Sequence, residues 1–213
     1  MAADRRPLTT REKGWAKWLA QELIDAHISP NTISVFSMVF AVIGAGFLLF
    51  IADAEPLTKR LLWLGTAAAI QFRLLANMLD GMVAVGGGTQ SKLGDLYNEI
   101  PDRVSDSLFF IAFGWVSDLT LGFTATAMAL FVSYIRAVGA AAGAGQCFKG
   151  WMSKPQRMFL LTLCSLFYAF APITWQGTFW RWGPSGWTLL IICIGCVFTA
   201  WTRLSHITRA LKS

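Results

Sequence analysis

The chain has few charged residues. Asp, Glu, Lys and Arg make up 14% of its 213 residues, whereas 55% are hydrophobic, and the mean hydropathy is +0.52. This composition excludes an ordinary soluble domain and predicts a polytopic membrane protein. We expect residues 1–213 to form a single membrane-embedded domain.

Cysteine and histidine are also scarce, with four and two residues respectively. The cysteines lack the pattern of a secretory disulfide framework, and Cys193 and Cys196 lie in an apolar run, which predicts buried thiols rather than a redox pair or a metal site. His27 and His206 flank apolar segments singly, without the spacing of metal ligands. No cleavable signal peptide is apparent, because the first thirty residues are polar and amphipathic.

Long apolar runs dominate the rest of the chain. Six of them have about the twenty residues that are needed to cross the hydrocarbon core of a bilayer. We therefore expect an all-α protein with six transmembrane helices, at residues 32–53, 61–85, 93–117, 120–144, 157–174 and 186–207.

A further helix is predicted at about residues 10–27, ahead of the first span. One of its sides carries tryptophans and leucines, and another carries lysines and a glutamine. These residues are Trp15, Trp18, Leu19 and Leu23 against Lys13, Lys17 and Gln21. The pattern predicts an amphipathic helix in the membrane surface, with a soluble cap on the bundle as the alternative. Ser29 and Pro30 then predict the N-cap and first position of the first span.

The net charge of +6 lies in the segments between the spans, so we expect contact with anionic lipid headgroups and not with nucleic acid. With six spans, most basic residues share one side, and Lys59, Arg60 and Arg181 lie on the other. The positive-inside rule then places both termini in the cytoplasm. We expect a multi-pass protein of a bacterial inner membrane.

Carboxylates and carboxamides gather near the ends of two neighbouring spans. Asn77 and Asp80 are three residues apart, while Asn98, Asp102 and Asp106 are four apart, so each set lies on one face of its helix. Polar groups at such positions are costly and indicate a functional site, although interhelical hydrogen bonds alone are the structural alternative. Oxygen ligands of this kind suit Mg²⁺ or Mn²⁺ held together with substrate phosphates.

The same segment resembles the signature of the CDP-alcohol phosphotransferase family, D-x-x-D-G-x-x-A-R followed after eight or nine residues by G-x-x-x-D-x-x-x-D. This chain reads Asn77-x-x-Asp80-Gly81-x-x-Ala84-Val85 and, after eight residues, Gly94-x-x-x-Asn98-x-x-x-Asp102. Two of the four acids are therefore amides, and the arginine is a valine. An amide oxygen still binds a hard cation but brings no negative charge.

The resemblance implies roles for these positions. In the family, three of the acids hold a pair of divalent metals that grip the CDP diphosphate, and the fourth deprotonates the acceptor alcohol. By position, the metal ligands are Asn77, Asp80 and Asn98, and Asp102 is the general base that completes the metal site. Glu99 and Asp106 are candidates to compensate for the missing charge. The candidate donor- and phosphate-binding residues are Arg73, Gly81, Ala84, Lys92 and Gly94.

The resemblance also implies an enzyme that transfers a phosphatidyl group from CDP-diacylglycerol to an alcohol, with release of CMP, and that works as a homodimer. Arg136, Lys154 and Arg157 are candidates for binding the acceptor or a lipid headgroup, with positive-inside anchoring as their structural alternative. Glycerol phosphate, inositol phosphate, serine and another phospholipid all remain open as acceptors. The other hypotheses are a non-catalytic lipid- or nucleotide-binding protein of the same fold and a small transporter that relays protons.

Overall fold

The structure, a computed structural model, describes residues 9–88 and 92–212. Within these ranges the chain forms seven α-helices and two short 3-10 turns. The helices are α1 (Gly14–Asp25), α2 (Pro30–Leu49), α3 (Pro56–Gly86), α4 (Lys92–Trp115), α5 (Leu119–Ala141), α6 (Lys154–Phe170) and α7 (Pro184–Ala210), and the turns are η1 (Thr9–Glu12) and η2 (Ile173–Trp175).

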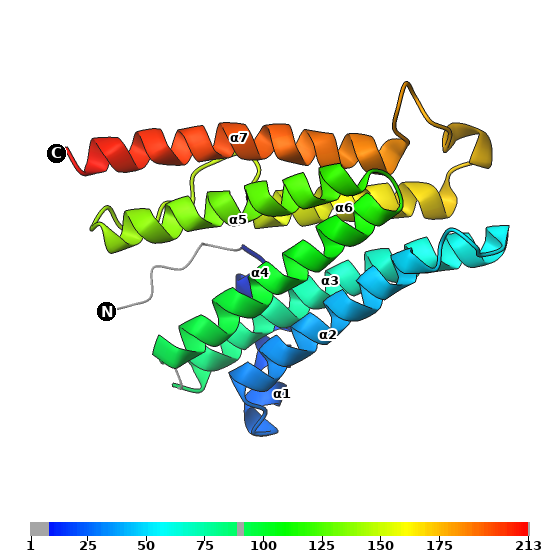
Figure 1. Ribbon diagram of the computed structural model, residues 1–213. Coiled ribbons are helices and arrows are strands. Elements are labelled where there is room, and N and C mark those ends of the chain that lie inside the picture. Colours follow the sequence, from blue (N-terminus) through cyan, green and yellow to red (C-terminus); the bar gives the residue numbers. More distant parts are fainter. Residues whose placement is uncertain (1–8, 89–91, 213) are drawn as a thin grey trace.

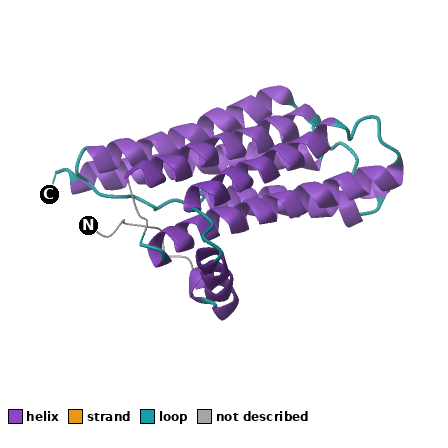
Figure 2. Ribbon diagram, turned by 90° about the horizontal axis from the view of Figure 1, so that it is seen from below, coloured by secondary structure: helices purple, strands orange, loops and turns teal. Residues whose placement is uncertain are grey.

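The six long helices form two groups that pack against each other. Helices α2, α3 and α4 lie together, and α5, α6 and α7 lie together beside them (Figure 1). Contacts of α3 with α6 and of α4 with α5 join the two groups. Figure 2 shows the long helices running along the length of the bundle. The short α1 lies across the end of α3 that carries the motif.

Each of the six predicted spans coincides with one helix, α2 to α7, with ends shifted by a few residues. Four of these helices, α2, α3, α5 and α7, are long and apolar enough to cross a membrane. Helix α6 has only 17 residues, and α4 carries several charged groups, including Glu99, Asp102, Arg103 and Asp106. The described part of the chain is thus an all-helical protein with four candidate membrane-spanning helices.

Two helix starts follow from local sequence. The Ser29 hydroxyl accepts a hydrogen bond from the backbone N–H of Thr32 at 3.1 Å, and Pro30 occupies the first position of α2, which confirms the predicted cap. Asp118 caps α5 in the same way, because its Oδ1 accepts hydrogen bonds from the backbone N–H groups of Thr120 and Leu121 at 3.0 and 3.2 Å. Both caps satisfy backbone donors that the helix leaves unpaired.

Helix α1 packs on α3 through small residues. Ala16 and Ala20 are buried in a cluster with Leu79 and Val83 of α3. Trp15 and Trp18 lie outside that cluster and are 47% and 63% exposed. Contact with the bundle and contact with the membrane surface are therefore compatible, because they use different sides of α1.

Helices α4 and α5 approach each other at the level of the backbone. A Cβ atom on Gly114 would lie 2.7 Å from the Cα of Gly122, closer than real side chains come. Glycine at these two positions therefore permits the tight corner between α4 and α5.

The segment between α5 and α6 is held by α7. The backbone N–H of Met152 donates to Thr199 Oγ1 at 2.8 Å, and Arg203 Nε donates to the carbonyl of Lys149 at 2.9 Å. Gly150 has φ +123° and lies directly against Thr199, so the chain passes α7 where only glycine fits. These contacts fix the point at which α6 begins with Lys154.

Candidate functional site

The motif side chains of α3 and α4 meet the start of α6 at a pocket of about 550 Å³. Asn77, Asn98, Glu99, Asp102 and Lys154 all line it. Its wall also includes residues of α5, of the segment before α6 and of the N-terminal turn. The convergence predicted from helical spacing is therefore present, and three helices contribute to it.

Asp80 lies behind the wall of this pocket. It is only 2% exposed, and its carboxylate is held on both sides. Ser34 of α2 donates to Oδ2 at 2.6 Å, and the amide nitrogen of Asn98 donates to Oδ1 at 2.8 Å. Asn98 thus turns its N–H groups, and not its oxygen, toward Asp80.

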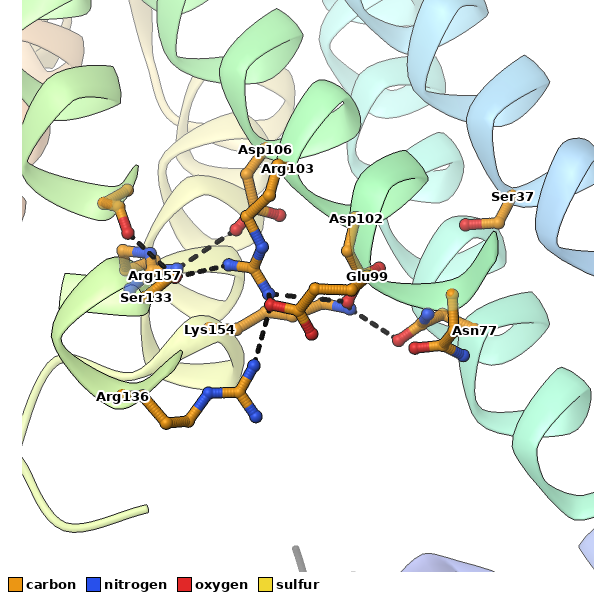
Figure 3. Close-up of polar contacts among 12 residues, drawn as sticks. Ser37, Asn77, Glu99, Asp102, Arg103, Asp106, Ser133, Arg136, Lys154 and Arg157 are labelled. Atoms are coloured by element: carbon orange, nitrogen blue, oxygen red, sulfur yellow. Dashed lines mark hydrogen bonds and ion pairs between the residues drawn. The ribbon is translucent and has the colours of Figure 1, made fainter. Parts of the chain in front are cut away.

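Asp102 is held between two cationic side chains. Arg73 Nη2 donates to Asp102 Oδ1 at 3.1 Å, and Lys154 Nζ donates to Asp102 Oδ2. The same ammonium donates to Asn77 Oδ1 at 2.5 Å, so Lys154 connects the motif residues of α3 and α4 (Figure 3). Asp102 is 6% exposed but lines the pocket.

Asp106 and Arg73 form an ion-pair network below the pocket. Arg73 Nη2 lies 2.8 Å from Asp106 Oδ1, and Arg157 Nη2 lies 3.1 Å from Asp106 Oδ2. All three side chains are at most 3% exposed. Arg73, a predicted phosphate-binding residue, and Asp106, a predicted metal ligand, lie outside the pocket lining and pair with each other. Arg157 reaches the pocket wall but is committed to Asp106 and to the carbonyl of Met152.

A second group of charged side chains, Glu99, Arg103 and Arg136, also lines the pocket. Glu99 Oε1 accepts from Arg136 Nη2 at 2.7 Å and lies 2.9 Å from Arg103 Nη2 (Figure 3). Arg103 also donates to Ser133 of α5 at 2.6 Å. Arg136, a predicted acceptor-binding residue, lines the pocket and has Glu99 as its partner.

The small residues of the motif, Gly81, Ala84 and Gly94, do not line this pocket. Gly81 is buried and lines a second hollow of about 410 Å³ together with Val85, Arg11 and Lys17. Ala84 and Gly94 are half-buried. Lys92 is the first residue of α4, and its side chain lies outside the described parts of the structure.

No protein-family model matches the chain. It is 28% identical over 165 residues to the phosphatidylinositol phosphate synthase of Mycobacteroides abscessus, and the alignment covers 74% of this chain and 70% of that protein. It is 29% identical over 154 residues to the archaetidylinositol phosphate synthase of Pyrococcus horikoshii, which covers 71% of this chain and 76% of that protein.

Solved structures give the fold. The phosphatidylinositol phosphate synthase of Mycobacterium tuberculosis with CDP-DAG bound matches with a TM-score of 0.69 and 21% identity, over 90% of this chain and 92% of that one. The chain has the fold of that synthase. The same synthase in complex with manganese and citrate matches with a TM-score of 0.70, over 90% of this chain and 88% of that one. The fold agrees with the resemblance that the motif indicates.

The motif offers oxygen donors that could hold a divalent cation. Among residues 9–88 and 92–212 there is no group of three or more His, Cys, Asp and Glu side chains placed to hold a metal ion. The motif offers two carboxylates, Asp80 and Asp102, and the two amides Asn77 and Asn98. One Mg²⁺ or Mn²⁺ ion needs only one or two carboxylates when substrate phosphates and water complete its shell.

Sequence reasoning missed the groups that come from outside the motif. Ser34 of α2 and the N-terminal residues Thr10, Arg11 and Trp15 reach Asp80 or the pocket wall from distant parts of the chain. A basic stretch at the N-terminus was visible in the sequence, but nothing in its spacing connects it to residue 77. Only the packing of α1 on α3 makes that connection.

Proposed function

We propose that the chain is a membrane-embedded CDP-alcohol phosphotransferase. It transfers a phosphatidyl group from a CDP-linked lipid such as CDP-diacylglycerol to an alcohol and releases CMP. The observation that carries this proposal is the meeting of the motif residues Asn77, Asn98 and Asp102 with Lys154 at one pocket. The fold and the sequence similarity to two lipid-phosphate synthases support it.

The proposal includes a setting in the membrane. All six helices α2 to α7 span the bilayer, and the polar faces of α4 and α6 turn toward the pocket, where protein groups satisfy them. The termini and the pocket face the cytoplasm, where CDP-linked substrates are available, because most basic residues lie on that side. Helix α1 lies in the membrane surface with Trp18 toward lipid, while Trp15 lines the pocket. The working form is the homodimer that the resemblance implies.

The residues divide the chemistry as follows. The acceptor hydroxyl oxygen attacks the phosphorus that carries the diacylglycerol, and the bond from that phosphorus to the bridging oxygen of CMP breaks. Asp102 Oδ2 faces the pocket beside Lys154 and takes the hydroxyl proton. Arg73 holds Oδ1 of the same carboxylate and fixes its orientation. A divalent cation held by Asp80, Asp102 and the amides Asn77 and Asn98 would supply charge neutralisation of the diphosphate.

The pocket favours an anionic acceptor. Apart from Lys154, its wall carries the cationic side chains of Arg11, Arg103 and Arg136. The carboxylates that line it are those of Glu99 and Asp102, which leaves positive charge in excess. A phosphorylated alcohol complements that excess better than serine does, and the two relatives are named as synthases of inositol phosphate lipids. We therefore propose a phosphorylated alcohol, such as inositol phosphate or glycerol phosphate, as the acceptor.

The test is CMP release from CDP-diacylglycerol by the purified chain in detergent, with Mg²⁺ or Mn²⁺, a panel of alcohols and an EDTA control. CMP that forms only with one phosphorylated alcohol supports the proposal and names the acceptor. Loss of activity in Asp102→Asn, but not in the exposed loop variant Asp53→Asn, assigns the reaction to this pocket. No CMP with any acceptor, while CDP-diacylglycerol still binds, would instead favour the non-catalytic relative.

A further inference from the structure

Lys154 lies where the oxygen atoms of the motif converge. Its ammonium contacts Asn77 Oδ1 of α3 and Asp102 Oδ2 of α4, and its side chain is only 17% exposed (Figure 3). A lysine that merely anchors the chain at a membrane surface keeps its ammonium in water or among lipid headgroups. Lys154 does the opposite, because it directs its charge into the protein between two motif positions.

The protein's own cations outnumber the acids around the site before any metal ion is added. Asn77 and Asn98 carry no charge, so the acids that remain are Asp80, Glu99, Asp102 and Asp106. Each of five cationic side chains contacts at least one of these acids. They are Arg73, Arg103, Arg136, Lys154 and Arg157.

Two divalent cations would add four positive charges to this set. The site already has one cation more than it has acids, and like charges in a site of low dielectric constant repel strongly. A single divalent cation raises the excess to three positive charges, which the two negative charges of a CDP-linked diphosphate reduce to one, whereas two divalent cations would leave three. The two amides in place of acids and the inward-pointing ammonium both make the site less negative. Both therefore disfavour a second metal ion.

We propose that the Lys154 ammonium takes the place of one metal ion in the diphosphate site, so that this chain binds at most one divalent metal ion there. The proposal rests on the proposed function for the identity of the substrate. When a diphosphate binds, the ammonium pairs with its oxygens and leaves Asp102 Oδ2, which then becomes available to accept the proton of the acceptor. Lys154 is thus a donor-binding residue rather than an acceptor-binding one.

The first experiment counts metal ions without any substrate. Mn²⁺ is titrated into the purified full-length protein in detergent, and free Mn²⁺ is followed by electron paramagnetic resonance. The wild type is expected to bind one Mn²⁺ ion or none per chain. In Lys154→Met, Asn77 Oδ1 and Asp102 Oδ2 lose the ammonium that they share. Mn²⁺ affinity is therefore expected to rise about tenfold or more. Two Mn²⁺ ions per wild-type chain, or an unchanged affinity in Lys154→Met, overturns the proposal.

Two further variants separate the effect of the Lys154 charge on Mn²⁺ binding from the effect of a folding defect. Lys149→Met removes an exposed lysine of the same interhelical segment and is expected to leave Mn²⁺ affinity at the wild-type value. The combination Asn77→Asp with Lys154→Met removes the ammonium and places a carboxylate at the position that it contacted. This variant is expected to bind a second Mn²⁺ ion. If this combined variant keeps the wild-type stoichiometry while its circular dichroism shows a folded protein, Lys154 does not exclude the second metal ion.

The binding of the donor gives an independent measurement. In EDTA, wild-type protein is expected to bind CDP through the ammonium, and Lys154→Met to bind it about tenfold or more weakly. Equal CDP binding by the two proteins in EDTA contradicts the proposal. Neither the Mn²⁺ count nor CDP binding requires turnover. A chain that never forms CMP therefore refutes the proposed function and leaves this test of Lys154 intact.

Discussion

Asp106 is the residue at which metal ligation and packing predict opposite results. Its carboxylate makes two ion pairs, to Arg73 at 2.8 Å and to Arg157 at 3.1 Å, and all three side chains are at most 3% exposed. Asp106→Asn keeps the shape of the side chain but removes its charge. Two buried guanidinium groups then lose their strongest partner, although Arg73 keeps Asp102 and Arg157 keeps the carbonyl of Met152.

Removal of one partner from a buried ion pair typically costs 3 to 5 kcal/mol, and the remaining contacts place this case at about 3 kcal/mol. For a chain of this size, that corresponds to a fall in Tm of about 6 to 12 °C. The assay is thermal unfolding in detergent followed by circular dichroism, together with the Mn²⁺ titration. The control is Asp53→Asn, in the loop between α2 and α3, where the side chain is exposed and no loss is expected. An unchanged Tm combined with a loss of Mn²⁺ affinity in Asp106→Asn would refute the packing role and restore Asp106 as a metal ligand.

Three other outcomes follow from the described geometry. Asp102→Asn should lower the rate of CMP release by about 100-fold or more while CDP-diacylglycerol binding persists, and an unchanged rate would remove Asp102 as the base. Gly114→Val should lower the Tm by several degrees, because its side chain meets the backbone of α5, whereas Gly46→Ala, with open space around its Cα, should not. The hydrogen bond from Trp182 Nε1 lowers the pKa of Asp118 below its ordinary value, so its carboxylate stabilises the folded protein at neutral pH and loses that effect as the pH falls through the lowered pKa. Asp118→Ala should therefore lower the Tm more at pH 7 than at a pH below the lowered pKa, where the protonated side chain of the wild type keeps only its neutral cap, and an equal loss at both pH values would contradict this.

Helical periodicity predicted the part of the site that depends on spacing along one helix. Residues three or four apart share a face, so Asn77 on α3 and Asn98 and Asp102 on α4 could be placed at one pocket before the fold was known. The N-cap of α2 at Ser29 followed from the same kind of local rule. These features are local because helix geometry fixes them without tertiary contacts.

Depth and long-range partners could not be predicted in this way. Asp106 has the same spacing from Asp102 as Asp102 has from Asn98, yet it lies one turn deeper and meets Arg73 and Arg157 instead of the pocket. Periodicity gives the face of a helix but not how far along that face the bundle closes. The contact of Lys154 with Asn77 joins residues far apart in sequence, and only the packing of α6 on α3 establishes it.

The way in which α7 holds the segment before α6 makes the last helix a remote determinant of catalysis. Thr199 touches no motif residue, but its hydroxyl accepts from Met152, and its side chain lies against Gly150, just ahead of Lys154. A substitution there changes where α6 begins and hence where the ammonium stands. Substitutions in α7 can therefore shift the Lys154 ammonium relative to Asn77 and Asp102 without altering a single residue of the signature.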